Sequence, residues 1–191
     1  MKHNFFLFLI FCLSSNFLIA QSANQNIPKE FGVDTILWNA NTFLQYSDFK
    51  AKPFGSFQGN TYAGIILDFK QDEKGIHLFT YTLFFCKHSF LKDSSKNLLN
   101  HEQLHFDITE LYARKLRQLI SQKDFQNEKS SADVIQKIYN AVTSDLNKEQ
   151  DKYDKETVHG TNYAKQLTWI NSIHEQLKQL ENYSAVEVVI D

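Results

Sequence analysis

The chain has 191 residues, of which 42% are hydrophobic and 22% charged, and its formal net charge is -2 at pH 7. This composition argues against bulk disorder and allows one domain with a sizeable core. The near-neutral charge gives no electrostatic basis for binding nucleic acid or an anionic membrane surface, because both require a basic face.

The first twenty residues, MKHNFFLFLIFCLSSNFLIA, form a segment of their own. Lys2 precedes an apolar run, and the small residue Ala20 precedes a polar stretch, which is the pattern of a secretory signal peptide. The run is short for a membrane span, and polar residues interrupt it. We therefore expect residues 1–20 to be a signal peptide and residues 21–191 to be one exported domain, periplasmic or extracellular, with no stable membrane span after signal removal.

Strand patterns come next along the chain. Residues 34–40, DTILWNA, form a short β-type run, and residues 61–70 and 75–88 are rich in β-branched and aromatic residues. The intervening QDEKG is typical of a hairpin turn, so these segments predict an antiparallel sheet. Cys86 is the only cysteine after the signal, and its apolar surroundings in the sequence predict a buried structural thiol.

The second half of the chain changes to helical patterns. They cover approximately residues 94–121, 131–151 and 162–182, and SAVEVVID closes the chain as a short alternating strand. Strands first and helices later favour an α+β fold over a parallel α/β sheet. We predict an N-terminal antiparallel sheet packed on a C-terminal set of about three helices.

The tetrapeptide HEQL occurs twice, and the first copy carries a candidate metal site. His101 and His105 are spaced i, i+4, so on a helix both imidazoles project from one face and can reach one metal ion. Glu102 is rotated by about 100° and can accept a proton from a water beside the metal. This is the H-E-x-x-H pattern of zinc peptidases. The complete motif on an amphipathic helix favours a metal site over two hydrogen-bonded core histidines.

The second copy begins at His174 and has Lys178 where the second histidine would be. Lysine has no free lone pair at neutral pH, so we assign no chemistry to this copy. On the helix of the first copy, Glu110 and Arg114 fall opposite the histidines and are predicted as an exposed i, i+4 pair. Asp107 also falls off the metal face, as a surface or supporting carboxylate.

Zinc in a catalytic site needs a third protein ligand and an open position for water. We favour His159 as that ligand, because a glycine follows it and allows a tight turn. Asp154 and Glu156 could hold its imidazole through the other nitrogen, or either could itself be the third ligand. Tyr163 or Tyr112 could donate a hydrogen bond to the oxyanion of the reaction.

The chain resembles the DUF922 family of predicted secreted bacterial zinc-dependent proteases. The resemblance rests on LLNHEQLHFDITELYARKLR, residues 98–117, and YDKETVHGTNYAKQLTW, residues 153–169. A weaker match lies in LWNANTFLQYSDFKAKP, residues 37–53, where QYSDF departs from the aromatic residue expected before Asp48. The resemblance extends over nearly all of the chain after the signal.

The resemblance implies a zincin-like metallopeptidase fold, with the H-E-x-x-H motif on the first long helix. It implies His101 and His105 as zinc ligands and Glu102 as the base. The second motif of the family, a histidine–glycine pair after an Asp-x-x-Thr run, maps onto Asp154, Thr157, His159 and Gly160.

We therefore predict a secreted zinc peptidase that binds Zn2+ and acts on a peptide or protein, with Glu102 as general base. An extended substrate could pair with a sheet edge beside the motif helix, and the segment of residues 75–86 is the candidate strand. The alternative is a non-catalytic envelope binding domain with a structural or vestigial zinc site.

Overall fold

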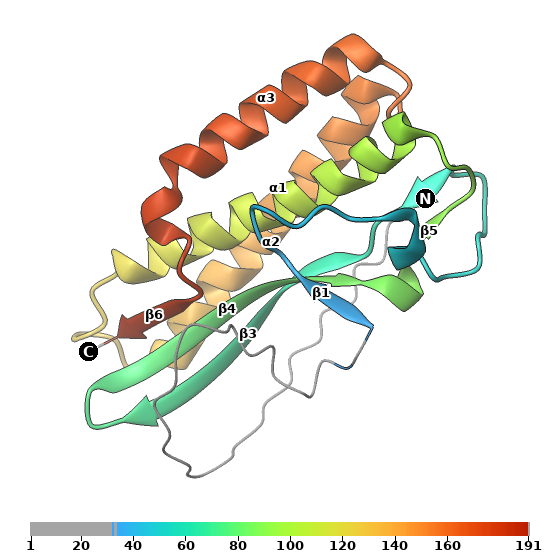
Figure 1. The fold of residues 1–191 in the computed structure, drawn as a ribbon. Coiled ribbons are helices and arrows are strands. Elements are labelled where there is room, and N and C mark those ends of the chain that lie inside the picture. Colours follow the sequence, from blue (N-terminus) through green and yellow to red (C-terminus); the bar gives the residue numbers. More distant parts are fainter. Residues whose placement is uncertain (1–31, 33, 191) are drawn as a thin grey trace.

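The computed structural model describes Gly32 and residues 34–190, so the predicted signal peptide lies outside the described residues. The described chain consists of antiparallel strands followed by three helices and a closing strand, which confirms the predicted α+β arrangement (Figure 1). The strands are β1 (Thr35–Leu37), β2 (Gly59–Asn60), β3 (Ala63–Asp72), β4 (Gly75–Phe85), β5 (Phe90–Leu91) and β6 (Glu187–Ile190).

The main sheet is built on the hairpin of β3 and β4, whose register runs from Ala63 opposite Phe84 to Asp72 opposite Gly75. The other side of β4 pairs with β1 near one end and with β6 near the other. The expectation that the strand of residues 75–86 forms a sheet edge is therefore wrong. β4 is the central strand because two separate segments complete its second side, and β3 is left at the edge among the described strands.

Each helix begins at a side chain that accepts a backbone N–H, as the N-cap preference for short polar residues requires. Ser95 caps α1 (Lys96–Ser121), Ser130 caps α2 (Ser131–Thr157) and Asn162 caps α3 (Tyr163–Gln179). α2 extends beyond the predicted end at residue 151, which places Asp154 in its last turn. Among the described helices, none combines the length and the apolar character that crossing a bilayer requires. Three short 3-10 turns complete the secondary structure: η2 (Tyr46–Asp48), η3 (Cys86–His88) and η4 (Glu181–Tyr183).

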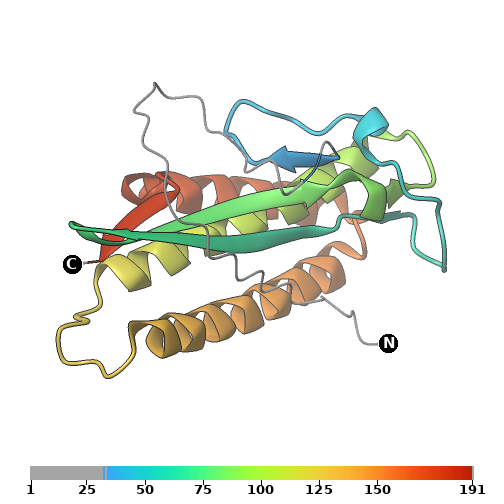
Figure 2. The same ribbon diagram turned by 90° about the horizontal axis from the view of Figure 1, so that it is seen from below.

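Helix α1 occupies the centre of the molecule (Figures 1 and 2). It packs against β3, β4 and β6 of the sheet and against both other helices. Helix α2 runs antiparallel to α1, and α3 runs antiparallel to α2 (Figure 1). Apolar residues of α1 such as Leu104, Ile108 and Leu111 are buried in the main core. Because neighbours cover α1 on nearly all sides, Glu110 and Arg114 are both 3% exposed. The pair exists, but the prediction that it is exposed is wrong.

A smaller apolar cluster lies around the end of β4 and includes Cys86. Cys86 is 3% exposed, which confirms the predicted buried thiol. Burial raises the pKa of this thiol, so it is a poor nucleophile.

Candidate metal centre

A cavity of about 330 Å³ lies between the N-terminal half of α1, the last turns of α2 and the segment of residues 56–61. This volume lies at the small end of the range for ligand pockets. Its charged and titratable lining consists of His101, Glu102, His105, Asp151, Asp154 and His159.

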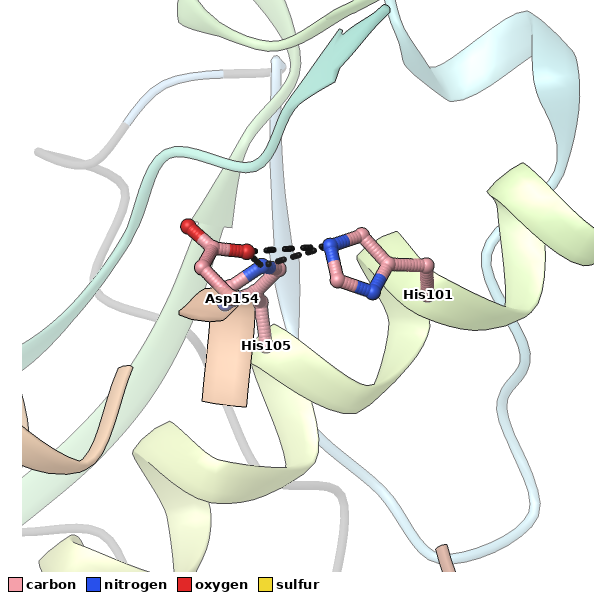
Figure 3. A group of neighbouring side chains, drawn as sticks. All are labelled: His101, His105 and Asp154. Carbon is pink, nitrogen blue, oxygen red and sulfur yellow. Dashed lines mark hydrogen bonds and ion pairs between the residues drawn. The ribbon is translucent and has the colours of Figure 1, made fainter. Parts of the chain in front are cut away.

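Three of these side chains converge on one point (Figure 3). His101 and His105 project from successive turns of α1, and Asp154 reaches them from α2. Oδ1 of Asp154 lies 3.1 Å from Nε2 of His101 and 3.0 Å from Nε2 of His105, and the two Nε2 atoms are 3.3 Å apart. The i, i+4 spacing therefore places the two imidazoles on one face of α1, as the sequence predicts, and α2 contributes a carboxylate to the same point.

The donor set and its spacing fit a zinc ion. Imidazole nitrogens and carboxylate oxygens are common zinc ligands, at about 2.0–2.2 Å from the metal. Two ligands of a tetrahedron with such bonds lie about 3.3 Å apart. The three separations of 3.0, 3.1 and 3.3 Å approach that value, so these side chains need little rearrangement to hold one ion.

The ring of His101 is held by packing. It stacks on Tyr153 with ring centroids 4.6 Å apart, and its side chain is 3% exposed. A Cβ at Gly160 would lie 2.9 Å from Cγ of His101, so the glycine makes room for the ring. Burial lowers the pKa of His101 to about 4, and Nδ1 is buried without a hydrogen-bond partner among the described residues. His101 is therefore neutral at pH 7 and has a lone pair for a metal.

The ring of His105 is held by hydrogen bonds. Its Nδ1 lies 2.6 Å from Oε1 of Gln150, on the face of α2 that also carries Asp154. Burial acts to lower the pKa of His105, but the Asp154 carboxylate outweighs it and raises the pKa to about 9. Burial acts to raise the pKa of Asp154, and hydrogen bonds from the two histidines hold it well below its usual range. A metal that binds here must displace the proton that His105 shares with Asp154.

Glu102 lines the same cavity and is 3% exposed. The segment that contains β2 covers it closely, since a Cβ at Gly59 would lie 2.3 Å from Oε1 of Glu102. Oε2 is buried and has no hydrogen-bond partner among the described residues. Burial raises the pKa of Glu102 to about 7, so this carboxyl can exchange a proton near neutral pH.

His159 lies beside this group at the mouth of the cavity. It follows the last turn of α2 in a left-handed conformation, with φ of 50°, and its side chain is 55% exposed. Its Nδ1 is 3.5 Å from Oδ1 of Asp154, and its ring contacts Phe57. Of the three candidates for third ligand, the structure groups Asp154 with the α1 histidines. Glu156 faces elsewhere and accepts a hydrogen bond from Trp169 Nε1 at 3.0 Å.

The tyrosines considered as oxyanion donors do not line the cavity. Tyr112 is 8% exposed in the main core, and Tyr163 is 68% exposed at the start of α3. In the second HEQL copy, His174 is 55% exposed and lies 3.5 Å from the Asp107 carboxylate, whose other partners include Trp38 Nε1. The second copy therefore lies apart from the cavity.

Three residues of the site escaped the sequence prediction: Gln150, Tyr153 and Gly59. Gln150 and Tyr153 share the face of α2 that also carries Asp154, at spacings of i, i+3 and i+4. A polar residue on the apolar stripe of this helix was the available signal for Gln150. Gly59 had no such signal, because its role depends on a contact with a residue far along the chain.

Two histidines and a carboxylate around a cavity, with a further buried carboxylate beside them, define a candidate metal centre in an α+β domain. Residues 89–160 match the family described as "Bacterial protein of unknown function (DUF922)", which supports the family resemblance drawn from the sequence. The match contains the H-E-x-x-H motif and ends at Gly160. It does not reach residues 37–53, so the wider resemblance stays a prediction. The comparisons with curated proteins and with solved structures gave no match.

Proposed function

We propose that this protein is an exported zinc-dependent peptidase whose metal is held by His101, His105 and Asp154. The observation that carries the proposal is the convergence of two imidazole Nε2 atoms and one carboxylate oxygen within about 3 Å of one another, beside a cavity. His159 is close enough to Asp154 to join or replace it when the site is loaded.

A zinc ion bound there would supply a Lewis acid that polarises a carbonyl group and lowers the pKa of a water molecule. The three ligands would orient the ion toward the cavity, and the surrounding buried side chains would limit access of bulk water. His101 and His105 supply lone pairs from rings that packing and hydrogen bonds already hold in place.

Glu102 would act as the proton carrier in hydrolysis of a peptide bond. Its carboxylate would take a proton from the attacking water and deliver it to the amine nitrogen as the bond between carbon and nitrogen breaks. A pKa of about 7 and an oxygen with no hydrogen-bond partner among the described residues suit this group to both steps near neutral pH.

Metal content of the purified protein tests the centre first. We expect about one zinc ion per chain after exposure to zinc, in agreement with a single mononuclear site. His101→Ala, His105→Ala and Asp154→Ala should lose the ion, whereas the second-copy variant His174→Ala should keep it. Loss of zinc in His159→Ala with retention in Asp154→Ala would show that the third ligand is His159 and not Asp154. A protein that takes up no zinc would contradict the proposal.

Hydrolysis of a mixture of quenched fluorescent peptides tests the catalytic part. Glu102→Gln should keep the zinc and lose cleavage by about 10²-fold or more, the usual effect of removing a general base. An activity that survives in Glu102→Gln would show that the proposed base is wrong. A protein that binds zinc but cleaves no peptide would instead favour the non-catalytic binding domain.

A further inference from the structure

Gln150 holds His105 from the side of the ring that faces away from the candidate metal position. Its Oε1 lies 2.6 Å from Nδ1 of His105, and its Nε2 donates to the backbone oxygen of His105 at 2.9 Å. Nε2 also lies 3.3 Å from Oγ1 of Thr109, one turn further along α1. Gln150 is 8% exposed, so water does not compete freely for these hydrogen bonds.

This network determines the orientation of the amide. A backbone carbonyl oxygen only accepts hydrogen bonds, so the amide group that faces the carbonyl of His105 must be the NH2 group. The other end of the amide, Oε1, then faces Nδ1 of His105. Because Oε1 only accepts, Nδ1 must carry the hydrogen. In the neutral ring this leaves the lone pair on Nε2, the atom that points at Asp154.

Helix α2 therefore holds one imidazole at both nitrogens. Gln150 and Asp154 are spaced i, i+4 and lie on one face, with Gln150 at Nδ1 and Asp154 at Nε2 of His105. His101 has no equivalent arrangement. Its Nδ1 lacks a hydrogen-bond partner among the described residues, and stacking on Tyr153 sets its ring position. The two histidines of the motif are thus positioned in different ways.

We infer that Gln150 is a positioning residue for the metal centre, which selects the tautomer of His105 that binds through Nε2. This inference rests on the proposed function, because it assumes that His105 is a metal ligand. Partners of this kind fix the orientation of a ligating histidine and raise its basicity. The sequence motif does not contain Gln150, which lies 45 residues after His105.

The test measures zinc affinity by competition with a chromophoric chelator. Gln150→Met keeps the length and apolar part of the side chain but removes the acceptor, and we expect about 10- to 100-fold weaker zinc binding. Gln150→Glu keeps an acceptor for the Nδ1 hydrogen but loses the donor to the backbone oxygen of His105, so its affinity should lie between those of Gln150→Met and the unmodified protein. Equal losses in both variants would show that an acceptor at Nδ1 of His105 contributes nothing to zinc binding and would overturn the inference.

Gln166→Met is the matched control. Gln166 is 2% exposed, and its Nε2 donates to the side chain of Asn97 at 3.0 Å, with no hydrogen bond to a candidate ligand. The same substitution there removes a buried amide of the same kind and should leave zinc affinity unchanged. If Gln150→Met binds zinc as well as Gln166→Met does, the inference fails while the proposed metal centre stands.

A second readout needs no variant. In the zinc-loaded, 15N-labelled protein, the imidazole Nδ1–H of His105 should give a slowly exchanging proton signal, because Gln150 accepts it in a buried position. Absence of that signal, or attachment of the proton to Nε2, would overturn the assignment to Gln150. Failure of the unmodified protein to bind zinc would remove the proposed function and this inference together.

Discussion

Two glutamates on the same helix are used in opposite ways. Glu102 and Glu110 are both 3% exposed on α1. Glu110 accepts hydrogen bonds from Thr82 Oγ1 at 2.7 Å, Arg117 Nη1 at 3.0 Å and Arg114 Nε at 3.1 Å. Glu102 has one oxygen with no hydrogen-bond partner among the described residues and faces a cavity. A buried carboxylate surrounded by donors holds the fold together, whereas one left open is available for chemistry.

The cluster around Glu110 connects several elements. Arg114 donates to the backbone oxygen of Leu177 in α3, and Arg117 donates to Thr80 of β4 and to Tyr183 of η4. Because an unpaired buried charge is costly, these bonds must form together. The cluster therefore fixes α1 against the sheet on one face, while the face with the histidines remains free to bind a ligand.

The largest expected effect comes from Glu110→Gln. Removing the charge takes the shared counter-ion from two buried guanidinium groups. Arg114 keeps its ion pair with Glu181 at 2.9 Å, whereas Arg117 is left with backbone oxygens, and we expect the free energy of unfolding to fall by about 3–5 kcal/mol. Urea unfolding followed by circular dichroism measures this change. Zinc affinity of the folded protein should be preserved, since no candidate ligand contacts Glu110. If Glu110→Gln lowers the free energy of unfolding no more than Glu102→Gln does, the proposed difference between the two glutamates is wrong.

Glu102→Gln should raise the free energy of unfolding of the metal-free protein at alkaline pH, the opposite of the change expected for Glu110→Gln. Burial raises the pKa of Glu102 from 4.5 to about 7, so the folded state holds this proton more tightly than the unfolded state. The resulting contribution to stability is complete below about pH 4.5 and is lost as the pH rises to about 7. Glutamine does not ionise, so at pH 8 the variant should be more stable by about 1–3 kcal/mol.

Urea unfolding with a chelator present, at pH 5 and at pH 8, measures the change caused by Glu102→Gln. The unmodified protein and the variant should be close in stability at pH 5 and separate at pH 8. Equal differences at the two pH values would show that Glu102 has no raised pKa in the folded protein.

Gly160→Ala should disturb the face of α1 that carries His101 and leave the cluster around Glu110 unchanged. Gly160 has φ of 80°, which costs an alanine about 1–2 kcal/mol, and the new Cβ would also press on His101. Gly55→Ala is the control, since Gly55 has φ of 64° but no other part of the described chain lies within 4 Å of its Cβ position. Gly160→Ala should lose more stability than Gly55→Ala, and only Gly160→Ala should also bind zinc more weakly. Equal zinc affinities would show that the His101 ring adapts without cost.

The smallest effect is expected near the surface, where a partly buried histidine pairs with two exposed carboxylates and provides a reference for the two buried glutamates. His77 on β4 lies 2.6 Å from Glu187 of β6 and 3.0 Å from Asp72 of the hairpin. The Glu187 carboxylate, and then that of Asp72, raise the pKa of His77 above 6.5. Its contribution to stability is therefore complete below pH 6.5 and is lost as the pH rises through the higher folded-state value.

Thermal unfolding of His77→Gln beside the unmodified protein, between pH 5.5 and pH 8.5, measures this contribution. The difference in melting temperature should be small at every pH and should shrink as the pH or the salt concentration rises. A difference that grows with pH would contradict the assigned ion pairs.

The order of elements and the H-E-x-x-H helix could be predicted from sequence because both depend on local spacing. The exposure of Glu110 and Arg114 could not, because a helical wheel gives the angle of a side chain but not what packs against it. Here the sheet covers one side of α1 and two helices cover others, so even the face opposite the histidines is buried.

The third member of the site shows a second limit of sequence reasoning. The sequence favours His159 over Asp154 as the third ligand, but the placement of both residues depends on where α2 ends. The helix continues through Thr157, so Asp154 projects from its last turn toward α1, and His159 lies beyond the end in a left-handed turn. Helix ends are among the least certain features of sequence prediction, so the carboxylate stayed an alternative.

The candidate ligands come from two antiparallel helices, α1 and α2, and His105 and Asp154 are 49 residues apart in the chain. An ion held by both would act as a cross-link that closes a loop of this length in the unfolded chain. By analogy with a disulfide, such a closure is worth about 4 kcal/mol. Helix α2 lies on the outside of the molecule (Figure 2), so zinc binding would stabilise the packing of α2 on α1 most. Slower amide hydrogen exchange along α2 would then report zinc binding, before any substrate is known.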